Sequence, residues 1–223
     1  KEEINPNDLE LYVIDAIKNA YVHIMAQNVY ENNIFVMKEY FNRLKNSDGK
    51  IMYPKTYMKV IKKLGLILEY DYLMLDHTIK NCINTKEQLF CITIHPTSLR
   101  NSSFLLKVKN LLNDYPEVKG KIVFMISELQ YYSNINKFNN TLQTLRKSGI
   151  KIAVDKLGSY HTSFLYLRDL DIDIIRFDTL YTKDISNEKY TSILEGLNVM
   201  AHKKGVKTWL KMVETKDVNN FAQ

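Results

Sequence analysis

A run of apolar, mostly β-branched residues from Ile150 to Val154, interrupted only by Lys151, is the feature of the sequence that most constrains the fold. Such a run is typical of a strand buried on both faces, as in a parallel sheet covered by helices. Asp155 and Lys156 follow directly, and a turn containing Gly158 comes next. In proteins built on parallel strands, ligands gather at the carboxyl ends of the strands. The stretch therefore predicts a site at Asp155, although a base beside this acid is a poor start for a metal site.

Segments of strand and helix character alternate along most of the chain. The expected strands cover residues 21–30, 34–44, 88–95, 121–127, 150–154, 172–177 and 206–211. The first two are joined by the short turn Glu31-Asn32-Asn33, so we expect them to pair antiparallel. The later strands are separated by helical patterns, which favours parallel pairing. The order predicts an α/β fold, a TIM-like βα-barrel with an antiparallel strand in its first unit.

No linker, repeat or low-complexity stretch interrupts this order, so residues 1–223 are expected to form a single domain. The sequence begins without methionine, and residues 214–223 start a helical pattern that no strand follows. We therefore expect a fragment of a longer protein that lacks the last elements of the barrel.

Composition is typical of a globular chain, with 45% hydrophobic residues, 7 glycines and 4 prolines. The net charge of +6 comes without a dense run of lysine and arginine, so no DNA or RNA partner is expected. No apolar run is long enough to cross a bilayer, so we expect no membrane contact by this fragment. The only cysteines, Cys82 and Cys91, lack the spacing of a metal site, and reduced cysteines favour a cytoplasmic location.

The carboxyl ends of the predicted strands carry an unusual set of side chains. In strand order they are Glu39 and Arg43, Thr93, Met125, Asp155 with Lys156, Arg176 with Asp178, and Lys211 with Glu214. A hydrolase that uses divalent metals needs several carboxylate or amide oxygens converging at this edge. Threonine, methionine and lysine stand at several of these positions instead.

The order of short motifs along nearly the whole chain resembles that of the EAL domains, which hydrolyse cyclic di-GMP in bacterial signalling. Gln27-Asn28-Val29 is similar to the family's Gln-Pro-Ile, and the segment from Glu39 to Arg43 resembles its signature Glu-Ala-Leu-Leu-Arg. Further similar segments are Ile92–Pro96 (Val-Asn-Leu-Ser-Pro), Met125–Glu128 (Glu-x-Thr-Glu), Asp155–Ser163 (Asp-Asp-Phe-Gly-Thr-Gly-Tyr-Ser-Ser), Asp173–Asp178 (Asp-x-x-Lys-Ile-Asp) and Leu210–Thr215 (Ala-Glu-Gly-Val-Glu-Thr). The resemblance implies the EAL fold and a place in a longer signalling protein.

The same resemblance implies that active relatives hold two Mg²⁺ or Mn²⁺ ions with Glu, Asn, Glu and paired Asp, and use a Lys to activate water. Glu39 and Asp155 match two of these acids. The positions that depart are Thr93 for Asn, Met125 for Glu, Lys156 for the second Asp, Arg176 for Lys and Lys211 for a further acid. A thioether is a poor ligand for hard cations, a lysine brings positive charge to a cation site, and an arginine stays protonated. We therefore expect no metal cofactor, no catalytic residues and a catalytically inactive EAL-like domain that serves as a regulatory or interaction module in cyclic di-GMP signalling.

Two other functions stay open, a metal-independent receptor for cyclic di-GMP and an active phosphodiesterase. The candidate nucleotide-binding residues are Gln27, Glu39, Arg43, Asp155, Arg176, Asp178 and Glu214. Arg43 matches the family arginine that contacts a phosphate, and its alternative is a bond to a neighbouring carboxylate. Buried charges need partners, so Asp155 is expected to pair with a neighbouring base, and Glu39 with Lys156 or Lys211. A protein partner or a homodimer is expected ahead of cyclic di-GMP, and His95, which replaces a family serine, is expected to be structural.

Overall fold

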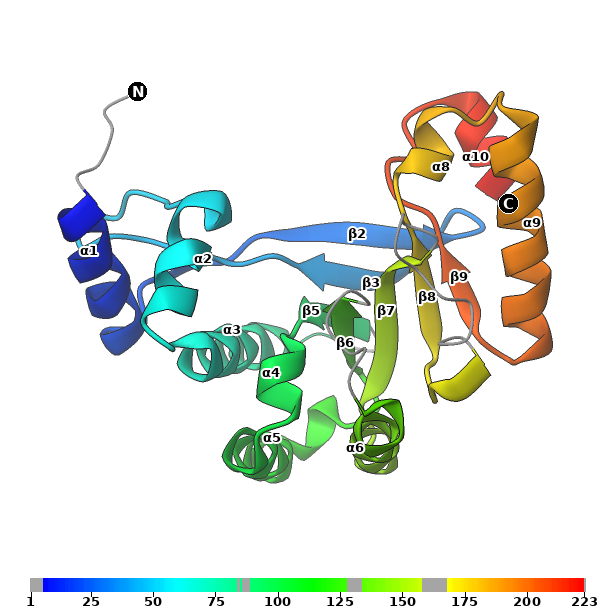
Figure 1. The fold of residues 1–223 in the computed structure, drawn as a ribbon. Coiled ribbons are helices and arrows are strands. Elements are labelled where there is room, and N and C mark those ends of the chain that lie inside the picture. The colour runs from blue at the N-terminus through cyan, green and yellow to red at the C-terminus, as the bar shows by residue number, and fades with distance from the viewer. Residues whose placement is uncertain (1–5, 84, 86–88, 128–133, 158–167, 223) are drawn as a thin grey trace. The chain divides into compact units, whose positions relative to one another are not determined.

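The computed structural model describes residues 6–83, 85, 89–127, 134–157 and 168–222 (Figure 1). They form two compact units. The first contains residues up to 29 and residues 35–121, and the second contains residues 30–34 and the chain from 122 onward. The expectation of a single domain stays a prediction.

The chain begins with helix α1 (Pro6–Lys18) and the strands β1 (Val22–His23), β2 (Ala26–Glu31), β3 (Ile34–Tyr40) and β4 (Arg43–Leu44). All of these residues belong to the first unit except the tip of the β2–β3 hairpin, residues 30–34, which belongs to the second. The turn between β2 and β3 places Asn32 at φ 50° and Asn33 at φ 63°, the left-handed pair that short hairpin turns require. β1 pairs with β4 antiparallel, as predicted.

The prediction of two long strands over 21–30 and 34–44 is wrong, because each strand is interrupted. At the interruption the Phe41 amide donates to the Met25 carbonyl at 2.9 Å, and Oδ1 of Asn42 accepts from the Met25 amide at 3.3 Å. The buried Asn42 side chain donates to the Thr78 hydroxyl at 3.0 Å. A side-chain amide thus replaces part of the strand ladder and fixes the chain just before Arg43.

The rest of the first unit contains α2 (Pro54–Lys63), α3 (Ile67–Cys82), β5 (Leu89–Thr93), α4 (Pro96–Leu99), α5 (Ser102–Asp114) and the 3₁₀ turn η1 (Pro116–Val118). Pro54 opens α2, and Gly65 follows it at φ 70°, as the sequence predicted. β5 runs parallel to β3, with Glu39 opposite Cys91. The short helix α4 was not predicted; it starts at Pro96, directly after His95.

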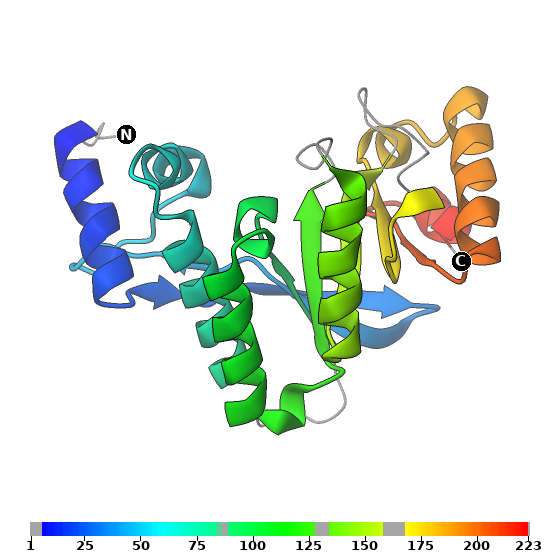
Figure 2. The same ribbon diagram turned by 60° about the horizontal axis from the view of Figure 1, so that its bottom comes forward.

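The second unit contains β6 (Ile122–Ser127), α6 (Ile135–Lys147), β7 (Lys151–Leu157), β8 (Ile174–Phe177), α8 (Leu180–Lys183), α9 (Glu188–Lys203), β9 (Lys207–Trp209) and α10 (Lys216–Ala222). β6, β7, β8 and β9 are neighbours in that order, and each pair is parallel. Helix α6 packs on β7, and α9 packs on β9, as Figure 2 shows from below. Helices on buried parallel strands are the arrangement that the apolar run Ile150–Val154 predicted.

Strand β7 is longer than predicted, because it continues through Asp155 and Lys156 to Leu157. Its pairing with β8 shifts register between Val154 and Leu157, and Lys156 has φ 62°. A shift of this kind is a β-bulge, which turns side chains at strand ends and is frequent beside functional sites. The bulge therefore sets where Asp155 and Lys156 project.

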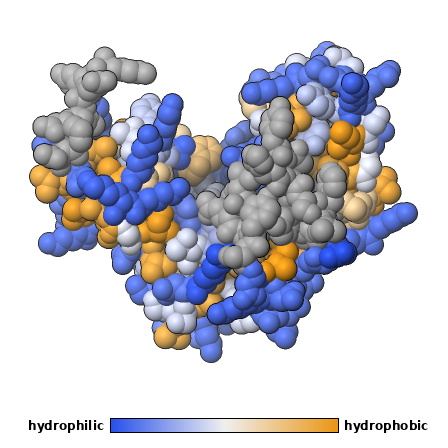
Figure 3. Space-filling model, in the orientation of Figure 1, coloured by the Kyte–Doolittle hydropathy of each residue, from blue (hydrophilic) through white to orange (hydrophobic). Residues whose placement is uncertain are grey.

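Apolar side chains of the parallel strands form the interior of the second unit, and Val123, Phe124, Ile152 and Ile175 have no exposed surface. The face shown in Figure 3 is mostly hydrophilic, with apolar side chains between the charged ones. Cys82 and Cys91 are both buried free thiols. Within the described ranges, no helix combines the length and the apolar character needed to cross a bilayer.

Candidate functional site

Two neighbouring strands of the second unit bring Asp155 and Arg176 together. Arg176 Nε donates to Oδ1 of Asp155 and Nη2 donates to Oδ2, both at 2.8 Å. The Arg176 side chain is only 3% exposed and that of Asp155 is 14% exposed. A bidentate, charge-assisted pair with both carboxylate oxygens engaged is among the strongest polar contacts a protein forms. The predicted ion pair of Asp155 with a neighbouring base is confirmed.

Two lysines and the only tryptophan complete this cluster. Lys211 Nζ lies 3.9 Å from Oδ2 of Asp155, and the Arg176 guanidinium lies 4.5 Å from the ring centroid of Trp209. Burial alone would raise the pKa of Asp155, but the hydrogen bonds and charge of Arg176, followed by the charges of Lys211 and Lys156, hold that pKa below its usual value. The carboxylate is therefore kept ionised by protein cations.

The residues of this cluster do not fit a divalent metal. Mg²⁺ and Mn²⁺ take oxygen ligands, whereas Asp155 already gives both oxygens to Arg176 and Met125, on the neighbouring strand, is a thioether at 1% exposure. Among the described residues, no group of three or more histidine, cysteine, aspartate or glutamate side chains is placed to hold a metal ion. Met125 is packed in the interior as a core residue.

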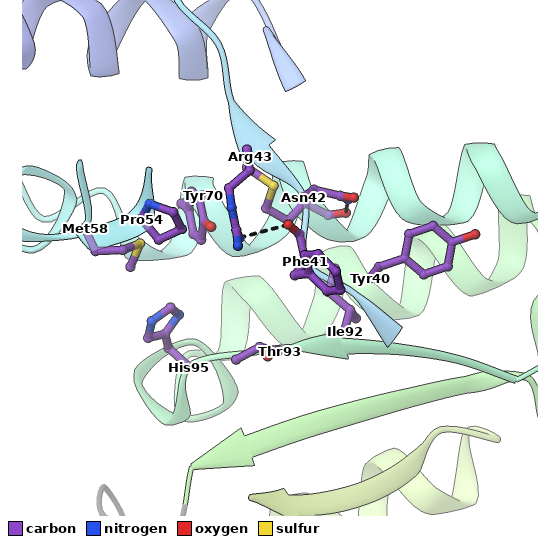
Figure 4. A pocket seen from close by; sticks show the side chains of 11 residues that line it. Tyr40, Phe41, Asn42, Arg43, Pro54, Met58, Tyr70, Ile92, Thr93 and His95 are labelled. Carbon is purple, nitrogen blue, oxygen red and sulfur yellow. Dashed lines mark hydrogen bonds between the residues drawn. The ribbon is translucent and has the colours of Figure 1, made fainter. Parts of the chain in front are cut away.

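The first unit contains a pocket of about 200 Å³ at the break between β3 and β4 (Figure 4). Its walls are largely apolar and aromatic, and the polar groups among its lining include Arg43, Thr93 and His95. In Figure 4 the Arg43 side chain reaches down between Tyr70 and Phe41, and the His95 ring rises toward Pro54 and Met58. A small apolar cavity with a few converging polar groups is the usual form of a ligand site.

Arg43 is held in this pocket by uncharged groups. Its Nη1 donates to the Phe41 carbonyl at 2.9 Å, and its guanidinium lies 5.5 Å from the centroid of the Phe41 ring. Burial raises the pKa of Tyr70 well above its usual value, while the positive charge of Arg43 opposes that rise. In the part of the chain that the structure describes, no carboxylate pairs with Arg43, so the alternative of a carboxylate partner is not observed there. A guanidinium without a counter-ion beside a cavity is suited to an anionic ligand.

Asp71 on α3 is a carboxylate with no exposed side-chain surface, and no motif in the sequence indicated it. Oδ2 of Asp71 accepts from the His95 amide at 2.8 Å and from the Ser98 hydroxyl at 2.6 Å, and Oδ1 lies 2.8 Å from Nδ1 of His95. A helical position at which an acid replaces the expected apolar residue was the only available signal. His95 also lines the pocket, and the expectation that its role is structural stays a prediction.

The other predicted residues lie as follows. Gln27 is exposed on β2, Glu39 is partly buried on β3, and Glu214 is exposed after β9. Oδ1 of Asp178 accepts from the Leu180 amide at 3.0 Å, where α8 begins. The expected pairing of Glu39 with Lys156 or Lys211 involves both units and stays a prediction. Glu128 and the motif residues 158–163 lie outside the described residues.

Comparison with known proteins decides the family, since the sequence model of the EAL domain matches residues 13–223. The chain belongs to the EAL domain family. This EAL domain is 27% identical over 221 residues to the cyclic di-GMP phosphodiesterase PdeA of Borreliella burgdorferi, covering 96% of this chain and 33% of that protein. It is 24% identical over 208 residues to the cyclic di-GMP phosphodiesterase PdeF of Escherichia coli, covering 91% of this chain and 28% of that protein. The chain thus spans about a third or less of the length of these relatives.

Solved EAL structures share the fold. The FimX EAL domain of Pseudomonas aeruginosa, bound to cyclic di-GMP, superposes with a TM-score of 0.85 at 20% identity, over 96% of this chain and 89% of that one. The FimX EAL domain of Xanthomonas citri, also in complex with cyclic di-GMP, gives a TM-score of 0.87 at 17% identity, over 96% and 87%. The predicted TIM-like α/β fold of EAL domains is confirmed.

Proposed function

We propose that this EAL domain is catalytically inactive and serves as a regulatory module in cyclic di-GMP signalling. The observation that carries the proposal is the bidentate pair in which Arg176 engages both oxygens of Asp155 at 2.8 Å. An acid that would ligate a metal is neutralised by a buried guanidinium, and Lys211 lies within 3.9 Å of it. A divalent cation could reach this carboxylate only if the ion pair broke. It would then lie beside the positive charges of Arg176 and Lys211, and Coulomb repulsion opposes this arrangement.

The names of the relatives favour an active enzyme instead, since PdeA and PdeF are named cyclic di-GMP phosphodiesterases. Between 24% and 27% identity, individual ligand positions can differ while the fold is kept. The side chains of this chain at those positions are therefore stronger evidence about its activity than the names of its relatives. Thr93, Met125 and Lys156 supply no carboxylate to a metal.

The test is the formation of linear dinucleotide from cyclic di-GMP in the presence of Mg²⁺ or Mn²⁺. The matched control is Glu39→Ala, which removes a surviving acid of the family signature. We expect the domain and the control to give the same background. Metal-dependent turnover that exceeds the control would refute the proposal.

A second candidate function is a metal-independent receptor for cyclic di-GMP, and the Arg43 pocket favours it. The Arg43 guanidinium has no carboxylate partner in the described part of the chain, and it lies in a pocket whose walls are largely apolar. Similar domains, the two FimX structures, are described as bound to cyclic di-GMP.

Calorimetric titration with cyclic di-GMP in EDTA tests this second candidate. Arg43→Ala is expected to weaken binding by about tenfold or more, because it removes a charge-assisted contact. Arg43→Lys, which keeps the charge without the planar fork, is expected to lose less. An affinity that is unchanged in Arg43→Ala would exclude this pocket as the binding site.

A regulatory module needs something to regulate, so we further propose a protein partner or a second copy of this domain, acting in the cytoplasm. Analytical ultracentrifugation over a range of concentrations, with and without cyclic di-GMP, tests the homodimer. A sedimentation coefficient that stays monomeric throughout would leave a different protein as the partner.

A further inference from the structure

The buried carboxylate of Asp71 fixes the imidazole of His95 at the edge of the Arg43 pocket. Asp71 is fully buried, whereas the His95 side chain is 18% exposed. Asp71 accepts from the His95 amide, the Ser98 hydroxyl and the ring of His95, so α3, β5 and α4 all hold this orientation. The ring also packs edge-on against Tyr70 at 6.3 Å between centroids. The imidazole is therefore fixed through its backbone amide, its Nδ1 and its ring contact with Tyr70.

The hydrogen bonds of Asp71 decide which nitrogen of His95 carries the proton. An ionised carboxylate can only accept, so the contact of 2.8 Å between Oδ1 and Nδ1 requires a proton on Nδ1. In a neutral imidazole the other nitrogen, Nε2, then has a lone pair and accepts hydrogen bonds. Because Asp71 engages Nδ1, Nε2 is the nitrogen left for a ligand in the pocket that His95 lines.

Arg43 and His95 together define a complementary ligand. Arg43 offers N–H donors and positive charge, which suit a phosphate oxygen, whereas Nε2 of His95 needs an O–H or N–H donor. Both side chains line a single pocket (Figure 4). At about 200 Å³ the pocket is smaller than the roughly 300–1,000 Å³ of sites that enclose a whole drug-sized ligand, so it fits one part of a dinucleotide.

We propose that His95 recognises the ribose of a nucleotide whose phosphate lies on Arg43, with a ribose hydroxyl donating to Nε2 of His95. In a 3′,5′-cyclic dinucleotide the only free ribose hydroxyl is the 2′-hydroxyl, so His95 makes the pocket selective for ribonucleotides over 2′-deoxynucleotides. This inference rests on the nucleotide-binding function proposed above, and it identifies the ribose 2′-hydroxyl as the group that His95 recognises.

The experiment compares the affinities of cyclic di-GMP and its 2′-deoxy analogue by calorimetry in EDTA at pH 8. The unmodified domain is expected to prefer the ribonucleotide by about tenfold, the value of one directed hydrogen bond. His95→Phe keeps a ring against Tyr70 but has no acceptor, so its preference is expected to fall to about twofold or less.

Circular dichroism verifies that the variant is folded, and His95→Ser, which leaves a hydroxyl that can still donate to Asp71, serves as the second variant. The same ribose preference in either folded variant as in the unmodified domain would refute the role of His95 while leaving nucleotide binding intact. Equal affinity of the unmodified domain for the two ligands would also refute it. Binding of neither ligand would instead overturn the receptor function on which this inference rests.

Discussion

The ion pair between Asp155 and Arg176 makes the most direct prediction about stability. Asp155→Asn removes the carboxylate that pairs with the buried Arg176 guanidinium, and removing one partner of a buried pair generally costs about 3–5 kcal/mol. Two features reduce that cost here. The asparagine Oδ1 can keep one of the two hydrogen bonds, and the ring of Trp209, 4.5 Å from the guanidinium, continues to stabilise the cation. We therefore expect unfolding free energy to fall by about 2–3 kcal/mol.

Urea unfolding followed by the fluorescence of Trp209 is the assay, because this is the only tryptophan in the chain and it contacts Arg176 directly. The matched control is Glu214→Gln, a neutralised acid on an exposed position close in sequence, which should stay within about 0.5 kcal/mol of the unmodified domain. If Asp155→Asn also stayed within that range, the ion pair would not be the stabilising contact that its geometry indicates.

Three further predictions concern the same charges and the buried acid of the first unit. Since the pKa of Asp155 is lowered, its contribution to stability is complete above the ordinary value of 3.8 and is lost as the pH falls through the lower value of the folded state. The stability difference between Asp155→Asn and the unmodified domain should thus be constant from pH 7 to about pH 5 and shrink below about pH 4, and a constant difference at pH 3 would contradict this. Asp71→Ala should lower unfolding free energy by about 3–5 kcal/mol in urea titrations, because it leaves the buried Ser98 hydroxyl and two groups of His95 without their acceptor, and a cost below about 1 kcal/mol would contradict that account. At Lys156, whose φ is 62°, glycine should be tolerated without loss while valine costs about 1–2 kcal/mol, and equal melting temperatures for the two variants would argue against the bulge.

Most of the helices and strands of this domain follow from local patterns in the sequence. The apolar run Ile150–Val154 predicted a buried parallel strand, and Pro54 and Gly65 bound helix α2 where their backbone preferences place them. The interruption at Phe41 and Asn42 could not be predicted, because it depends on a hydrogen bond from Met25, 17 positions away. The continuation of β7 through Lys156 was missed for a similar reason: a bulge depends on pairing with β8, and lysine carries no preference for a positive φ.

For the candidate site, too, some features could be predicted from the sequence and others could not. The predicted order of strands placed Asp155, Arg176 and Lys211 at strand ends, and in the structure these three side chains form one cluster. The contact of Asp71 with His95 joins residues 24 positions apart on a helix and a strand end, and no periodicity in the sequence connects them. The sequence thus indicates which residues stand at strand ends, whereas their partners depend on tertiary packing.

Direct measurement of Mn²⁺ binding by electron paramagnetic resonance tests the central claim, that protein cations replace the metal ions at Asp155. If protein cations occupy this site, the unmodified domain binds no more Mn²⁺ than the Asp155→Asn and Glu39→Ala variants do. Bound Mn²⁺ in the unmodified domain that either substitution abolishes would contradict it.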